Sequence, residues 1–189
     1  MGGDLPTPPS DQAAPRFIVA AWRDDFIKTN LQQIQIIKGW AVEGGDPQEA
    51  VYTVAGAPGD PLNPSDRLDP ATCKPYPNVG RRRLCAVWED PDFDLKQNAF
   101  YYVRVLEEPV CRYSTLWCRE RIGVDPLDPQ QCAADLEALA NGTVEEQLKA
   151  MQGAQCCLND QATETEHYLQ PVIQERAWTS PIWYTPPDA

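Results

Sequence analysis

The sequence predicts a mainly β protein, an antiparallel β-sandwich-like domain with an inserted helical hairpin tied by disulfides. Short runs of aromatic and β-branched residues alternate with turn residues along most of the chain, as in strands joined by loops. Proline accounts for 19 of the 189 residues, about twice the ~5% of average proteins, which disfavours long helices. Seven cysteines without a CxxC spacing indicate disulfides more than a zinc site.

The strands follow a proline-rich, polar lead-in at residues 1–15, and the β domain covers residues 16–189. Strands are predicted at 16–22, 31–40, 49–56, 84–90, 99–108 and 177–184. The second and third should form a hairpin, because a Gly-Gly-Asp-Pro turn at 44–47 separates them.

The last strand, 177–184, contains Pro181, which cannot donate a hydrogen bond to a ladder and therefore belongs at an edge or a bulge. Strict alternation places Trp178 and Trp183 on opposite faces, unless a bulge at Ser180 and Pro181 resets the phase. In either case we expect this strand to need cover on both faces.

Helical signals replace the strand pattern in an insertion at about 126–168. A first helix begins with Asp128 as N-cap and Pro129 in its first turn, and it stops at an Asn-Gly pair. A second helix begins with the capping-box spacing of Thr143 and Glu146 and ends at a glycine. The two together predict a helical hairpin.

All seven cysteines are disulfide candidates: Cys73, Cys85, Cys111, Cys118, Cys132, Cys156 and Cys157. Cys73 and Cys85 are the first predicted pair, because the turn-rich stretch between them can fold back. Because Cys132 lies on the first helix and Cys156 and Cys157 follow the second, a bridge could close the helical hairpin or tie it to Cys111 or Cys118. The adjacent Cys156 and Cys157 each look for another partner, because a bridge between neighbours is strained.

The compartment follows from these cysteines, since disulfides persist in oxidising surroundings. The start "MGGDLP" has neither the basic beginning nor the apolar centre of a signal peptide. The two observations together predict a chain that has lost its beginning and belongs to a periplasmic or extracellular protein.

Charge and hydropathy exclude several partners. The net charge of −12 and the pI near 4.4 disfavour binding to nucleic acid or to an anionic membrane surface. No stretch approaches the ~20 apolar residues of a membrane span.

Two residue groups are candidate sites. Asp90, Asp92 and Asp94 alternate in "WEDPDFD", a spacing that can present carboxylates to calcium, although Asp-Pro pairs are also ordinary turn formers. Arg104 lies among the aromatic residues of the fifth strand, and with Trp178 and Trp183 it forms a candidate cleft. The null alternative is an arginine whose head lies in water. The single histidine, His167, is expected on the surface.

The segments "LQQIQIIKGW", "VYTVAG", "LCAVWEDPDFD", "AFYYVRVLEEPVCRYSTLWC" and "IQERAWTSPIWY", in this order, resemble the C-terminal part of a bacterial domain-of-unknown-function family. Its members are similar to exported relatives of the PHP-type metal-dependent phosphoesterases. The resemblance implies that metal-binding residues and a divalent metal belong to an N-terminal catalytic part. It gives this chain no catalytic, cofactor-binding or metal-binding residue, and one histidine is too few for a PHP-like cluster.

The leading hypothesis is therefore a non-catalytic C-terminal β domain, inert by itself, whose partner is the catalytic domain of the same protein. That domain would also cover the second face of the final strand. One alternative is a secreted module that binds carbohydrate or peptide through exposed aromatics such as Trp22, Trp40 and Trp117. Another is a small domain stabilised by calcium at Asp90, Asp92 and Asp94.

Overall fold

The computed structural model describes residues 2–10, 13–41, 44–56, 64–157 and 170–187. His167 lies outside these residues. The chain forms two compact units: one contains Met1–Asp60, Asn78–Glu108 and Glu175–Ala189, and the other contains Pro61–Pro77 and Pro109–Gln174. Each unit is described by itself.

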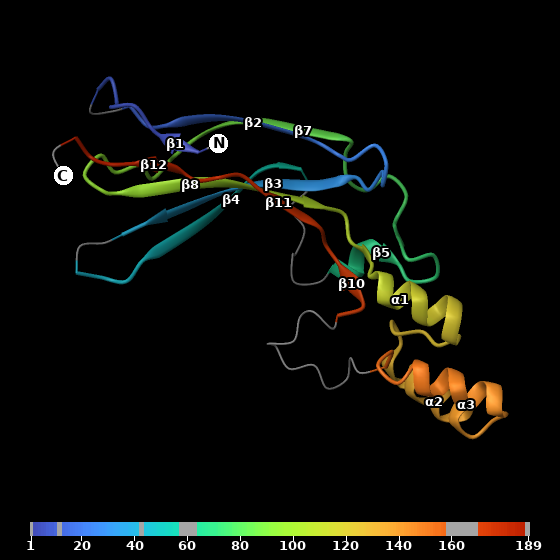
Figure 1. The fold of residues 1–189 in the computed structure, drawn as a ribbon. Coiled ribbons are helices and arrows are strands. Elements are labelled where there is room, and N and C mark those ends of the chain that lie inside the picture. The colour runs from blue at the N-terminus through green and yellow to red at the C-terminus, as the bar shows by residue number, and fades with distance from the viewer. Residues whose placement is uncertain (1, 11–12, 42–43, 57–63, 158–169, 188–189) are drawn as a thin grey trace. The chain divides into compact units, whose positions relative to one another are not determined.

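The first unit is built from strands (Figure 1), namely β1 (Gly3–Asp4), β2 (Arg16–Trp22), β3 (Leu31–Trp40), β4 (Gln48–Gly56), β7 (Arg83–Glu89), β8 (Ala99–Glu107), β11 (Arg176–Trp178) and β12 (Ile182–Tyr184). Its main sheet has the order β1-β12-β8-β3-β4, and β11 also pairs with β8. All pairs are antiparallel except β1 with β12. The predicted hairpin of the second and third strands is confirmed as β3 and β4.

β2 and β7 form a separate two-stranded ribbon over one face of the main sheet. Alternation gives the ribbon an inner face that packs on the sheet: Phe17 contacts Tyr101 of β8 with ring centroids 4.9 Å apart. Ile34 and Ile36 of β3 complete this core. β3 is buried along nearly its whole length because it is a central strand with neighbours on both sides.

The final stretch forms two strands rather than the single predicted one, which corrects that prediction. Pro181 interrupts the ladder, and β11 and β12 pair separately with β8. Trp178 lies opposite Arg104, and Trp183 lies opposite Phe100. Because residues 100 and 104 of one strand share a face, the break at Pro181 resets the phase and brings both tryptophans to the same side.

The second unit combines short strands with helices: η1 (Pro64–Arg67), β5 (Leu68–Asp69), β6 (Lys74–Pro75), β9 (Val110–Cys111), α1 (Tyr113–Trp117), η2 (Cys118–Ile122), α2 (Pro129–Ala140), α3 (Val144–Gln152) and β10 (Val172–Ile173). The predicted helical hairpin is α2 and α3. Asp128 caps the Gln131 amide, and Thr143 and Glu146 form the predicted capping box. The patterns did not predict α1 and η2.

Three disulfides join Cys73 to Cys111, Cys118 to Cys156, and Cys132 to Cys157. The predicted bridge between Cys73 and Cys85 is wrong, because Cys85 lies on β7 of the other unit and is the one cysteine without a disulfide partner among the seven, all described. The adjacent Cys156 and Cys157 pair elsewhere, as predicted. One bridge closes the hairpin and the next ties it to η2, so both alternatives for the hairpin occur.

The coarse fold class is thus confirmed: mainly β with antiparallel strands, three α-helices among the described residues and three disulfides. None of the helices within these residues has the length and apolar character needed to cross a bilayer.

Candidate functional site

The face of the main sheet opposite the ribbon carries four aromatic side chains and one arginine. This surface is here called the aromatic face: Phe100, Tyr102, Arg104, Trp178 and Trp183. The rings of Phe100 and Tyr102 stack at 6.4 Å with an angle of 12°, and Trp183 lies 5.2 Å from Phe100. Gly39 makes this possible, because a Cβ there would lie 2.2 Å from the Phe100 ring. Trp178 and Trp183 remain 59% and 50% exposed.

Arg104 forms the polar end of the aromatic face. Its Nε donates to Gln35 Oε1 at 2.7 Å, which holds the guanidinium in place across β8 and β3. Trp178 lies directly opposite it on β11, and the exposed Arg176 shares the same face two residues earlier. The structure therefore brings Arg104, Trp178 and Trp183, the predicted cleft residues, to one surface, and it adds Phe100, Tyr102 and Arg176.

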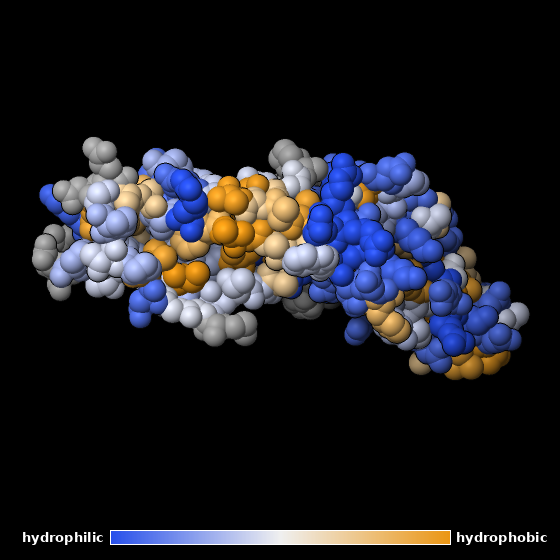
Figure 2. Space-filling view, turned by 90° about the horizontal axis from the view of Figure 1, so that it is seen from above, coloured by the Kyte–Doolittle hydropathy of each residue, from blue (hydrophilic) through white to orange (hydrophobic). Residues whose placement is uncertain are grey.

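A second surface lies on the outer side of the ribbon and is here called the apolar ladder: Ile18, Ala20, Trp22, Cys85 and Val87. Cross-strand register places Ile18 beside Val87 and Ala20 beside Cys85. Ile18 is 82% exposed, Trp22 66% and Val87 65%. Figure 2 shows this surface from above as an orange area over the ribbon. Contiguous exposed apolar patches of this kind mark interaction sites.

The predicted calcium ligands are held by protein groups. Asp90 is buried and accepts from Lys38 Nζ at 2.6 Å and from the Tyr101 hydroxyl at 2.7 Å. The carboxylate of Asp92 accepts from Tyr52, and that of Asp94 accepts from the Lys96 amide. A calcium ion would have to displace the Lys38 ammonium. The geometry therefore favours an ion pair between Asp90 in the turn and Lys38 on β3.

The carboxylates alter the two tyrosines that face them. Burial and the hydrogen bond to Asp90 raise the pKa of Tyr101 far above its usual range. Burial and the hydrogen bond to Asp92 raise the pKa of Tyr52 to about 12. Both hydroxyls therefore stay protonated and act as hydrogen-bond donors to Asp90 and Asp92 at any physiological pH, not as bases.

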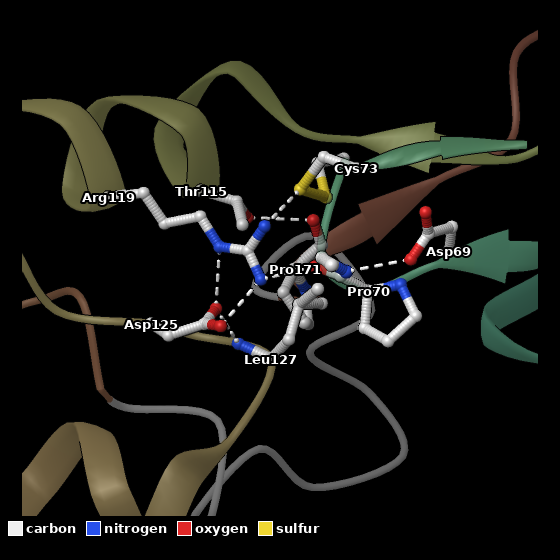
Figure 3. Close-up of polar contacts among 10 residues, drawn as sticks. Asp69, Pro70, Cys73, Thr115, Arg119, Asp125, Leu127 and Pro171 are labelled. Atoms are coloured by element: carbon white, nitrogen blue, oxygen red, sulfur yellow. Dashed lines mark hydrogen bonds and ion pairs between the residues drawn. A yellow bond between two sulfur atoms is a disulfide. The ribbon is translucent and has the colours of Figure 1, made fainter.

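A clamp in the second unit is centred on Arg119 (Figure 3). Its guanidinium donates to both Asp125 carboxylate oxygens, to the Pro70 carbonyl at 2.6 Å and to Cys73 Sγ at 3.0 Å. Burial alone would raise the pKa of Asp125, but hydrogen bonds from Arg119 and the Leu127 amide hold it below its ordinary value. All four of these Arg119 hydrogen bonds are to groups of the second unit itself, so the clamp has a structural role.

The three tryptophans of the binding-module hypothesis differ in exposure. Trp22 is open on the apolar ladder. Trp40 packs against the core, with Lys38 Nζ 5.4 Å from its ring centroid. Trp117 packs against the cluster around the Cys118 disulfide. Of these three tryptophans only Trp22 is open to a ligand, whereas the aromatic face gathers several rings on one surface.

No group of three or more His, Cys, Asp or Glu side chains suitable for a metal ion occurs in the part of the chain that the structure describes. Within it, the carboxylate closest to a metal-site pattern, Asp90, is neutralised by Lys38.

Comparison with known proteins identifies a family. The model of the family described as "Protein of unknown function (DUF3604)" matches residues 1–135 and 154–186. The chain belongs to the DUF3604 family. The match to DUF3604 includes all strands of the main sheet, and the unmatched residues 136–153 hold the end of α2 and all of α3. No curated protein and no solved structure matches the chain.

Proposed function

We propose that this chain is the non-catalytic β domain of a DUF3604 protein related to the PHP-type metal-dependent phosphoesterases, and that it docks on the catalytic domain of that protein. By itself it hydrolyses nothing. The divalent metal and its ligands belong to the catalytic domain. The full protein acts in the periplasm or outside a bacterial cell.

The apolar ladder is the observation that supports this proposal. Ile18 and Val87 form one cross-strand pair, and Trp22 extends the surface by one further row. Burying a side chain of this size stabilises a complex by about 1.5–3 kcal/mol. In a chain of net charge −12, such a surface is best explained as the contact area of a partner that stays bound.

Two further observations agree with the proposal. The three disulfides suit a protein that matures in an oxidising compartment. Asp90, the buried member of the three aspartates that could have formed a metal site, serves the core instead, since it binds Lys38 and Tyr101. A scaffold role requires a packed core and an exposed apolar surface for a partner. The first unit has such a core, and the apolar ladder is such a surface.

The test compares two purified proteins in a phosphoesterase assay with Mn²⁺ or Zn²⁺ and p-nitrophenyl phosphate. One is this chain, and the other is the longer polypeptide that includes the segment encoded upstream of it. We expect turnover only from the longer polypeptide. Reproducible turnover by the chain alone, or none by either protein, contradicts the proposal.

Docking is tested by adding the chain to the separately purified upstream segment and measuring complex formation by light scattering. Ile18→Asp should abolish the complex, because it places a charge in the ladder. The matched control is Val144→Asp, at an apolar position on α3 that is 75% exposed. Equal binding by both variants would rule out the ladder as the contact.

A further inference from the structure

We propose that the aromatic face binds an anionic carbohydrate, with Arg104 and Arg176 holding a uronate carboxylate and Trp178 stacking on the sugar that carries it. This goes beyond the proposed docking role and uses the other side of the first unit. The apolar ladder lies on the outer face of the ribbon, and the aromatic face lies on the side of the main sheet that the ribbon leaves open.

The two arginines supply the charge. Arg104 uses Nε for its bond to Gln35, so the guanidinium is fixed while its Nη atoms make no hydrogen bond with any described residue. Arg176 is exposed, lies opposite Leu106 and shares the face of Arg104. Planar guanidinium groups match carboxylates in a bidentate geometry. Two of them beside one indole form a local positive area on a strongly acidic protein.

The aromatic rings supply the surface for sugars. Trp178 lies opposite Arg104 and two residues after Arg176 on β11, at one end of the aromatic face. Four residues further along β8, Phe100, Tyr102 and Trp183 form a second group whose rings are in contact. Four residues of a strand span about 14 Å, which leaves room for more than one sugar ring. The electron-rich faces of aromatic rings attract the polarised C–H groups of such rings.

The charges along the aromatic face give the ligand a direction. Glu49 on β4 is exposed and lies opposite Gly39, in the row of Phe100 and Trp183. A carboxylate is repelled at that end and attracted at the end with Arg104. We therefore place the anionic sugar at Trp178 and a neutral part of the chain at Trp183.

Single-stranded nucleic acid also combines aromatic stacking with cations. However, it carries a charge on every nucleotide, and a chain of net charge −12 with two arginines on this face repels it. A glycan with sparse carboxylates meets less repulsion. Carbohydrate is therefore the favoured ligand, and nucleic acid is one of the outcomes that the test can return.

The test titrates the full chain with cellotriose oxidised to a single terminal glucuronate, here called the mono-uronate, and follows tryptophan fluorescence. We expect saturable quenching that weakens with added salt, because the carboxylate contact is screened. Neutral cellotriose and oligothymidylate serve as comparison ligands and should bind at least about tenfold more weakly, a difference of ~1.4 kcal/mol.

Two variants locate the site: Arg176→Gln and Trp178→Ala should each weaken binding at least about tenfold. Both residues are exposed, so the fold should persist, which a thermal melt checks. The controls are Arg83→Gln and Trp22→Ala, exposed residues on the ribbon. Equal affinity for the neutral sugar, tighter binding of the nucleic acid, no quenching at millimolar mono-uronate, or unchanged binding by both site variants would overturn the proposal.

This outcome is separable from that of the docking test. Loss of docking in Ile18→Asp with mono-uronate binding intact leaves the sugar site standing. Loss of sugar binding in Trp178→Ala with docking intact leaves the proposed function standing.

Discussion

Lys38 and Asp90 form an ion pair of 2.6 Å in the core of the first unit, with side chains that are 3% and 0% exposed. The ammonium also donates to the Asp92 carbonyl at 2.7 Å, and Asp90 accepts from the Tyr101 hydroxyl. The turn 90–92 is thereby fastened to β3 and β8. The pair gives the aspartates of this turn a structural role.

Lys38→Met should destabilise the protein by about 3–5 kcal/mol, because it leaves the buried Asp90 carboxylate without its cation. Urea unfolding followed by tryptophan fluorescence measures the change. Lys96→Met, at an exposed lysine of the following turn, should change the free energy of unfolding by no more than ~0.5 kcal/mol. If Lys38→Met lowers the free energy of unfolding by less than about 1 kcal/mol, the ion pair does not hold the turn to the sheet.

Gly39→Ala should disturb the aromatic face. The new Cβ would lie 2.2 Å from the Phe100 ring, so the ring has to move away from Gly39, which alters its contact with Trp183. We expect a destabilisation of about 1–3 kcal/mol and a shift of the tryptophan emission. The same substitution at Gly44, where nothing lies near the added Cβ but φ is +68°, tests backbone strain alone and should leave the emission unchanged.

Asp125 predicts a dependence of stability on pH. Its pKa is lower in the folded protein than the ordinary 3.8, so its contribution is complete above the unfolded value and is lost as pH falls through the folded one. Asp125→Asn should flatten the fall in melting temperature below pH 4. Glu120→Gln, an exposed neighbour of Arg119, is the control. If the melting temperature of Asp125→Asn falls below pH 4 as steeply as that of the unaltered protein, Asp125 does not stabilise the fold through the clamp.

Replacing Cys132 and Cys157 together by serine should cost about 3–4 kcal/mol in the chain-entropy model, because that bridge closes a segment of 25 residues. Hydrogen exchange in α2 and α3 should accelerate. Cys85→Ser should change neither exchange nor stability, since Cys85 has no disulfide partner. A peptide map that joins Cys73 to Cys85 under non-reducing conditions would contradict the assigned pairs.

Local signals were sufficient for the strands and the helical hairpin. The runs at 16–22 and 31–40 end where β2 and β3 end, because turn residues follow each of them. Asp128 and Thr143 mark helix starts through side-chain bonds to the next turn, which short-range spacing records.

Long-range partners could not be predicted in the same way. Cys73 bonds Cys111, 38 residues away, whereas sequence proximity favoured Cys85. Lys38 and Asp90 are also far apart in sequence, and nothing in "WEDPDFD" indicates a cation from β3. For the aromatic face, alternation supplied the right residues, but their common side depended on how Pro181 divides β11 from β12.

The alkylation rate of Cys85 tests the docking proposal most directly, because this thiol lies in the middle of the apolar ladder and is exposed in the chain alone. The measurement compares modification by iodoacetamide in the chain and in the longer polypeptide that carries the upstream segment. We predict a rate at least about tenfold slower in the longer polypeptide, equivalent to ~1.4 kcal/mol of protection. The same rate in both would contradict the docking of a catalytic domain on this surface.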